Sequence, residues 1–143
     1  MSNTTFKSLA DTTLDSVEGY RKAIEKAKSP HLKQALQRRL EAREATLESM
    51  NGELRRQGDE LVTKGTVTGD LHRLWTEIAD LFENGDQAAA ERVEEGEYYI
   101  KAKFEKALKG DTLSAEERAV VQSCFNEIAE GEAFGNSIEK QYD

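Results

Sequence analysis

The sequence predicts an all-α protein, a four-helix bundle with one long crossover connection between its second and third bundle helices. Three observations lead to this fold class. Helix-favouring Ala, Glu, Lys, Leu and Arg dominate the 143 residues, and Pro30 is the single proline. Apolar residues recur at spacings of three and four, with no strand-like alternation. Start and stop signals divide the chain into four long helical segments and one short one.

The first two predicted helices form an antiparallel hairpin. The first covers about residues 5–28, and Ser29 and Pro30 then serve as N-cap and first residue of the second. Such a tight junction makes the two helices neighbours. The second helix extends to about Gln57 and stops at Gly58. Its inner stripe reads Leu32, Leu36, Leu40, Arg43, Leu47, Met50 and Leu54.

The connection that follows is long and carries a helix of its own. Residues 58–69 are the least hydrophobic stretch of the chain. A short, strongly apolar helix is predicted over about residues 70–83, and we expect Trp75 to anchor it. Asn84 and Gly85 end this helix.

The last two predicted helices form a second hairpin. Asp86 is expected to cap a helix over about residues 87–109. Ser114 and Glu117 then form a capping box for the last helix, which runs nearly to the C-terminus. Two tight hairpins joined by one full-length crossover make the ferritin-like arrangement, so we expect one ferritin-like domain over residues 1–143.

Charge limits the classes of partner. The formal net charge of −8 argues against non-specific nucleic-acid binding and against docking on an anionic membrane surface, because both need a basic face. The first residues hold no apolar leader, and no apolar run approaches a membrane span, so we expect a cytoplasmic protein. The single cysteine, Cys124, lies on an apolar stripe, which predicts a buried small hydrophobe rather than a nucleophile.

Four groups of residues carry a family resemblance. They are Glu18-Gly19-Tyr20-Arg21-Lys22-Ala23, Arg38-Arg39-x-x-x-Arg43, Leu71-His72-Arg73-x-Trp75 and Glu94-x-Gly96-Glu97. With these residues the chain resembles a family of small bacterial ferritin-like four-helix-bundle proteins of unknown function, over about residues 8–140. The resemblance implies the fold and no activity, since the family has no agreed one.

The number and positions of the histidines argue against the usual metal site of ferritin-like proteins. Di-iron members place two glutamates and two Glu-x-x-His motifs inside the bundle. This chain has two histidines, His31 at the start of the second helix and His72 at the start of the crossover helix. Neither can complete a motif in the middle of the bundle. We therefore expect no resident metal.

Several polar residues nevertheless fall on inner faces at one height. At about 100° per residue, Arg43, Glu97 and Glu132 lie on their inner stripes, with Arg21 near its own. Glu18, Arg43, Glu97 and Glu132 all lie roughly 9 to 12 residues, about 14 to 18 Å, from one end of the bundle. We expect them to converge on one layer.

Two interpretations of this layer are open. In the first, Arg43 pairs with Glu97 and Glu132 beside Arg21, forming a structural ion-pair layer. In the second, oxygen ligands hold iron or manganese, and the candidate ligands are Glu18, Glu44, Glu94, Glu97 and Glu132. The central guanidinium opposes the second, because its positive charge occupies the place of a cation.

The expected function follows from this layer. We expect a non-enzymatic bundle that acts through protein interaction, in stress physiology, as a homo-oligomer or with another protein; the alternative is a metal-binding, ferroxidase-like bundle. No catalytic residue is predicted, since phosphate loops, Ser/His/Asp sets and Cys/His pairs are missing from the sequence. Tyr98, Tyr99 and Phe134 lie outside the inner stripes, where either the crossover helix or an oligomer partner could cover them.

Overall fold

The computed structural model describes residues 4–63, 70–81 and 85–141, and these form an all-helical protein with five helices. The helices are α1 (Thr4–Lys26), α2 (Pro30–Arg56), α3 (Asp70–Leu81), α4 (Asp86–Lys109) and α5 (Ala115–Gln141). This confirms the predicted helical class and the order of four long helices and one short one. The predicted end of the crossover helix at residues 82–83, its stop signal Asn84 and the end of the loop at residues 64–69 lie outside the described residues.

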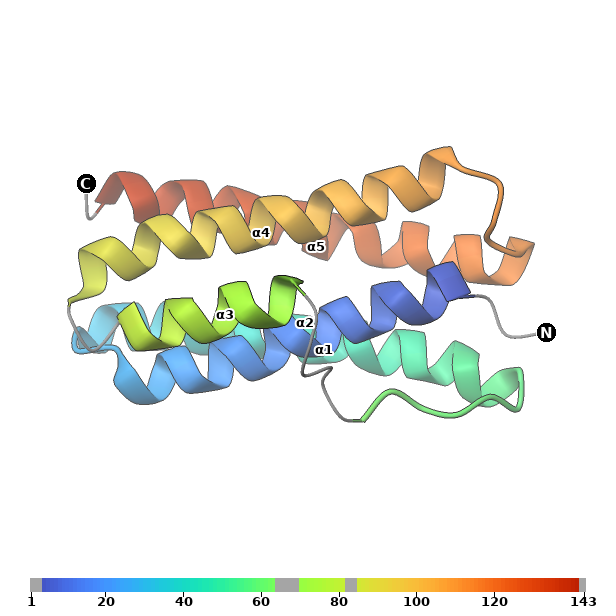
Figure 1. The fold of residues 1–143 in the computed structure, drawn as a ribbon, viewed down its shortest axis with the longest axis horizontal. Helices are drawn as coiled ribbons and strands as arrows, with labels where there is room; N and C mark the ends of the chain where they lie inside the picture. The colour runs from blue at the N-terminus through green and yellow to red at the C-terminus, as the bar shows by residue number, and fades with distance from the viewer. Residues whose placement is uncertain (1–3, 64–69, 82–84, 142–143) are drawn as a thin grey trace.

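The four long helices lie side by side, and α3 runs alongside them and packs against α1 and α4 (Figure 1). α1 packs against α2 and α4 against α5, while α2–α5 and α1–α4 contacts join the two hairpins. One end of the molecule holds the α1–α2 connection, the start of α4 and the C-terminus; the other holds the N-terminus and the α4–α5 turn (Figure 1). Side chains halfway along the long helices can therefore meet in one layer.

Local signals set the helix ends, as the sequence predicts. The Ser29 hydroxyl accepts a hydrogen bond from the Leu32 backbone N–H at 3.3 Å, which caps α2. Gly58, whose φ is +74°, follows the end of α2 in the left-handed conformation that favours glycine. At α5 the capping box is complete: the Glu117 N–H donates to the Ser114 hydroxyl at 3.1 Å, and the Ser114 N–H donates to the Glu117 carboxylate at 2.9 Å.

The role predicted for Asp86 is wrong. Gly85 occupies the N-cap position of α4, and Asp86 is the first helical residue. The Asp86 carboxylate instead accepts hydrogen bonds from the backbone N–H groups of Lys28 and Ser29, at 3.2 and 3.1 Å. The physical reason is that the reversal between α1 and α2 leaves backbone donors next to this carboxylate, which ties the first hairpin to the start of the second.

The first part of the crossover is fixed to the outside of the first hairpin. The buried Asn51 amide donates to the Val62 carbonyl at 3.0 Å and accepts from the Val62 N–H at 2.9 Å. Lys7 of α1 forms an ion pair with Asp59 at 3.0 Å. A single side chain thus satisfies both backbone groups of Val62, as an adjacent strand would.

α1 is the most enclosed helix, and residues 12–17 are all buried. Three helices, α2, α3 and α4, pack around it. The apolar faces of the other long helices meet in the same core. Within the described part of the chain, no helix combines the length and hydropathy needed to cross a membrane.

Trp75 anchors α3, as predicted. Its side chain is 1% exposed and lies between α1 and α4, over Gly19 of the former and Gly96 of the latter. A Cβ at Gly19 would come within 2.5 Å of the indole ring, and one at Gly96 within 3.1 Å. Both helices therefore use glycine where the ring approaches their backbones.

We expect Gly19→Ala to lower the free energy of unfolding by about 1–3 kcal/mol, because the added methyl overlaps a rigid ring. Gly52→Ala in α2 is the matched control: nothing lies within 4 Å of its Cβ position, so it should raise stability by about 0.5–1 kcal/mol. Urea unfolding of both variants measures the difference. Equal changes in the free energy of unfolding would contradict the close contact between Trp75 and Gly19.

Candidate functional site: a buried arginine–glutamate layer

The guanidinium of Arg43 lies at the centre of the protein, and its side chain is 0% exposed. Arg43 Nη1 donates to Glu97 Oε1 at 3.0 Å, and Nη2 donates to Glu97 Oε2 at 2.7 Å. This is a two-pronged pair between α2 and α4 in which both partners are fully buried. The structure thus brings together Arg43 and Glu97, the first pair of the predicted layer.

A second carboxylate completes the coordination of Arg43. Its Nε donates to Glu127 of α5, at 3.0 and 3.2 Å from the two carboxylate oxygens. Thr46 donates to Glu127 Oε1 at 2.6 Å, and Arg39 Nη2 forms an ion pair with the same carboxylate. Glu127 is 15% exposed and joins two arginines of α2 to α5.

α1 supplies a neutral group to the same layer. Arg43 Nη1 also donates to the Ser16 hydroxyl at 2.9 Å, and that hydroxyl donates to the Thr13 carbonyl at 2.8 Å. All three guanidinium nitrogens of Arg43 therefore have acceptors, drawn from three different helices. We call this group the Arg43 layer; its members are Ser16, Arg39, Arg43, Thr46, Glu97 and Glu127.

The Arg43 layer balances its charges internally, with two arginines against two glutamates. Burial alone would lower the pKa of Arg43, but the carboxylates of Glu97 and Glu127 outweigh burial and raise that pKa. The arginine is therefore held in its charged form at any pH at which the protein folds. The network is neutral but not closed, since Arg39 Nε is buried with no hydrogen-bond partner among the described residues. Buried polar contacts of this kind constrain how the contributing helices pack.

Glycine lets α5 approach the layer. A Cβ at Gly131 would lie 1.8 Å from Glu97 Oε2 and 2.5 Å from Arg43 Nη2. One helical turn later, a Cβ at Gly135 would lie 2.9 Å from the Glu94 Cα. The backbone of α5 therefore passes directly over the ion pair, and no side chain fits between them.

This close approach explains why the predicted place of Glu132 in the layer is wrong. Gly131, not Glu132, faces the ion pair, and the Glu132 carboxylate points to Lys101 at 3.8 Å and to Asn136 at 2.6 Å. The α5 carboxylate that binds Arg43 is Glu127, five residues earlier.

Arg21 also lies outside the layer, contrary to the prediction. It is exposed, and its Nη2 pairs with Glu44 at 2.7 Å across the outer edge of the first hairpin. The neighbouring Tyr20, not Arg21, faces the interior, because one residue along a helix turns the side chain by about 100°.

The ligands of the alternative, metal-binding interpretation do not converge. Glu44 pairs with the exposed Arg21, Glu97 with Arg43, and Glu132 with Lys101. Glu18 of α1 and Glu94 of α4 are half-buried, at the margins of the inner faces of their helices. Over residues 4–63, 70–81 and 85–141, no three His, Cys, Asp or Glu side chains are grouped so as to hold a metal ion. The side chain of His72 lies outside the described residues.

Sequence reasoning missed four members of the layer, and two of them left a signal. Arg39 and Thr46 lie four residues before and three after Arg43, which is the spacing of one helical face. Glu127 follows Cys124 by three residues and borders the inner stripe of α5, but it reads as part of an acidic surface. Ser16 gave no signal, since serine is common on any helix surface.

An aromatic pair covers the layer on the α3 side. The centroid of the Tyr20 ring lies 5.9 Å from the Arg43 Cζ atom and 4.7 Å from the centroid of the Trp75 ring. The rings are inclined at 47°. Burial, with a further contribution from Glu97, raises the pKa of Tyr20 well above its usual value. Within the described part of the chain, the Tyr20 hydroxyl has no hydrogen-bond partner.

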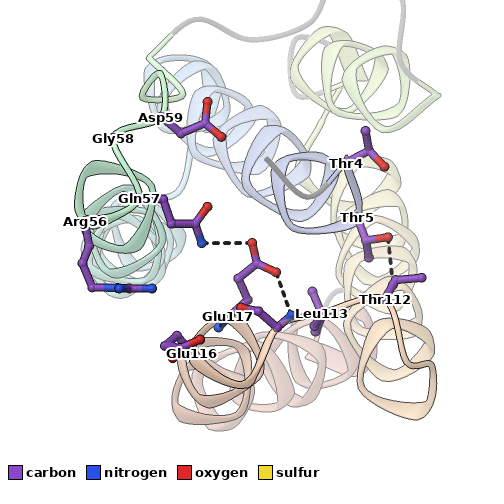
Figure 2. Close-up of a pocket in the computed structure, with 11 residues that line it drawn as sticks. Thr4, Thr5, Arg56, Gln57, Gly58, Asp59, Thr112, Leu113, Glu116 and Glu117 are labelled. Atoms are coloured by element: carbon purple, nitrogen blue, oxygen red, sulfur yellow. Dashed lines mark hydrogen bonds between the residues drawn. The ribbon is translucent and has the colours of Figure 1, made fainter. Parts of the chain in front are cut away.

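A polar pocket of about 930 Å³ opens at the end of the molecule that holds the α4–α5 turn (Figure 2). Gln57 and Glu117 point toward each other there, and the Gln57 amide donates to the Glu117 carboxylate at 3.0 Å. Thr112 donates to Thr5 at 3.0 Å on the opposite wall. These groups join helix ends to one another.

Loss of the buried cation should be costly. We expect Arg43→Met to lower the free energy of unfolding by about 3–5 kcal/mol, because Glu97 would stay buried without a partner. Arg21→Met is the matched control and should cost about 1 kcal/mol or less, since it breaks an exposed pair. Chemical unfolding of both variants gives the comparison. A harmless Arg43→Met substitution would contradict the burial of this pair.

The Tyr20 hydroxyl offers a test with a pH signature. We expect Tyr20→Phe to change stability at neutral pH by about 1 kcal/mol or less, because no hydrogen bond is lost. A pKa raised in the folded state means that stability is full below the unfolded pKa near 10 and falls as the pH rises above it. The wild type should therefore lose stability more steeply than Tyr20→Phe above about pH 10. Urea unfolding across this range checks both; parallel curves would contradict the raised pKa.

The comparisons with known proteins place the chain in a family. A family model described as a domain of unknown function, DUF2383, matches residues 2–110. That stretch contains Ser16, Arg43 and Glu97, whereas Glu127 lies beyond it. No curated protein and no solved structure matches the chain significantly. The chain thus belongs to the DUF2383 family, a domain family whose function is unknown.

Proposed function

We propose that this protein is a ferritin-like four-helix bundle in which an arginine takes the place that metal occupies in di-iron relatives, and that it acts by protein interaction rather than catalysis. Its topology supports the first part. Two antiparallel hairpins are joined by one long connection, and the long helices pack side by side, as in bundles of that class.

The position of the Arg43 guanidinium is the observation that carries the proposal. It takes both oxygens of Glu97 and contacts both oxygens of Glu127. A divalent cation at the centre of the bundle would need these same oxygens and would lie next to a fixed positive charge. The residues present therefore do not fit an iron or manganese site.

The chemistry of the layer supports a structural role. A reaction needs a nucleophile, a base or an acid with capacity left to act, and the donors of Arg43 and the carboxylates of Glu97 and Glu127 are engaged with one another. Burial raises the pKa of the Cys124 thiol, against weaker opposing hydrogen bonds, so this single cysteine is a poor nucleophile.

We place the protein in the cytoplasm and in stress physiology, with another copy of itself or another protein as partner. The net charge of −8 favours a protein partner over nucleic acid or an anionic membrane. The absence of a metal or other cofactor is part of this proposal.

Elemental analysis tests the proposal. The wild type, Glu97→Ala and the matched control Glu91→Ala would be purified after growth with added iron and manganese, and each reconstituted with Fe(II). We expect far less than one metal ion per chain in all three proteins, because Arg43 occupies the carboxylates.

Stoichiometric metal in the wild type and in Glu91→Ala, but not in Glu97→Ala, would overturn the proposal in favour of the ferroxidase-like alternative.

A further inference from the structure

One side of α4 is exposed and regularly spaced. Its residues lie on the face opposite the core, at spacings of four and three: Glu91, Glu95, Tyr98, Ala102, Glu105 and Lys109. Tyr98 lies in the middle of this face and is 62% exposed. Among the described residues, it is the one large hydrophobic side chain that is exposed to solvent. We call these six residues the α4 outer row. Tyr99 and Phe134, by contrast, pack partly against the core.

Charge is distributed unevenly along the α4 outer row. The N-terminal half carries Glu91 and Glu95, and the C-terminal half carries Glu105 and, at its end, Lys109 beside the exposed Lys106. Between them lie Tyr98 and the small Ala102. The two ends of the row carry opposite charges, Glu91 and Lys109, and its centre holds Tyr98 and Ala102, so the ends and the centre complement a reversed copy.

We propose that the α4 outer row binds the α4 outer row of a second copy of this chain, antiparallel, about a two-fold axis near residue 100. Glu91 then faces Lys109 of the second copy, and Lys109 faces its Glu91. Tyr98 lies on the second copy's Ala102, where a methyl group leaves room for the ring. Each of these contacts occurs twice because the axis relates the two copies.

Electrostatics favour this arrangement over other pairings. A parallel pair would set like charges against each other at all four charged positions of the row, whereas the antiparallel pair joins Glu91 to Lys109 at both ends and opposes the two helix dipoles. Glu95 does face Glu105 of the second copy. Arg92 moderates that repulsion, since it already pairs with Glu95 at 2.9 Å.

The expected dimer is weak. A single helix pair buries an area at the low end of specific interfaces, and the net charge of −8 on each copy opposes association. The Glu91–Lys109 contacts at both ends and the Tyr98–Ala102 contacts at the centre are what make a second copy, rather than an unrelated acidic protein, the occupant. This inference rests on the proposed role in protein interaction and names its surface.

Charge reversal tests the pairing. Sedimentation velocity over a wide range of concentrations would measure the dimer dissociation constant for the wild type, Glu91→Lys, Lys109→Glu and the double variant. Each single reversal places like charges in both end contacts, and we expect the dissociation constant to rise roughly tenfold. The double variant restores both contacts and should return near the wild-type value. Glu48→Lys, on the exposed side of α2, is the matched control and should have no such effect.

Substitutions of Tyr98 provide a second, independent test of the dimer. Tyr98→Arg should abolish dimerisation, whereas Tyr98→Phe should retain it, since the ring and not the hydroxyl lies on Ala102. A wild type that stays monomeric at every concentration would overturn the inference. So would a dimer that survives both single reversals, or a double variant no better than the singles. None of these results affects the metal analysis, so the two proposals fail separately.

Discussion

The guanidinium of Arg43 is the constraint on which the middle of this protein depends. A buried charge persists only where acceptors surround it, and here they come from α1, α4 and α5. Each of these helices must hold its position and rotation for its acceptor to reach Arg43. Replacing such a pair by well-packed apolar residues is often neutral or stabilising, so in the proposed structural role the pair fixes helix register more than it adds stability.

The tight approach of the helices follows from the same constraint. α5 can bring Glu127 to Arg43 only by passing over the ion pair at Gly131, where a methyl group would overlap the carboxylate. On the other side, Tyr20 and Trp75 close the layer, and Gly19 and Gly96 admit the Trp75 ring. Trp75 of the short helix α3 thus packs on the Tyr20 ring beneath Arg43. The full burial of the Arg43–Glu97 pair strengthens the charge interaction between them.

Much of this arrangement could be predicted from the sequence. Periodicity and capping residues predict the helices, because those effects are local, and an arginine on a stripe of leucines predicts a buried cation. The choice of Glu127 over Glu132 could not be predicted, because it depends on how deeply α5 sinks at Gly131, a property of packing between distant helices. The actual role of Asp86 is equally hidden from the sequence, which predicts a local cap, because its hydrogen-bond partners lie on the other hairpin.

Nitrogen-15 NMR of the Arg43 side chain tests the central claim most directly. A guanidinium bound on all three nitrogens and shielded from water should show separate Nη–H signals and hydrogen exchange slowed nearly to the rate of global unfolding. Averaged, rapidly exchanging signals like those of an exposed arginine such as Arg21 would contradict the account, because they would mean that Arg43 reaches water and that the layer does not fix the helices.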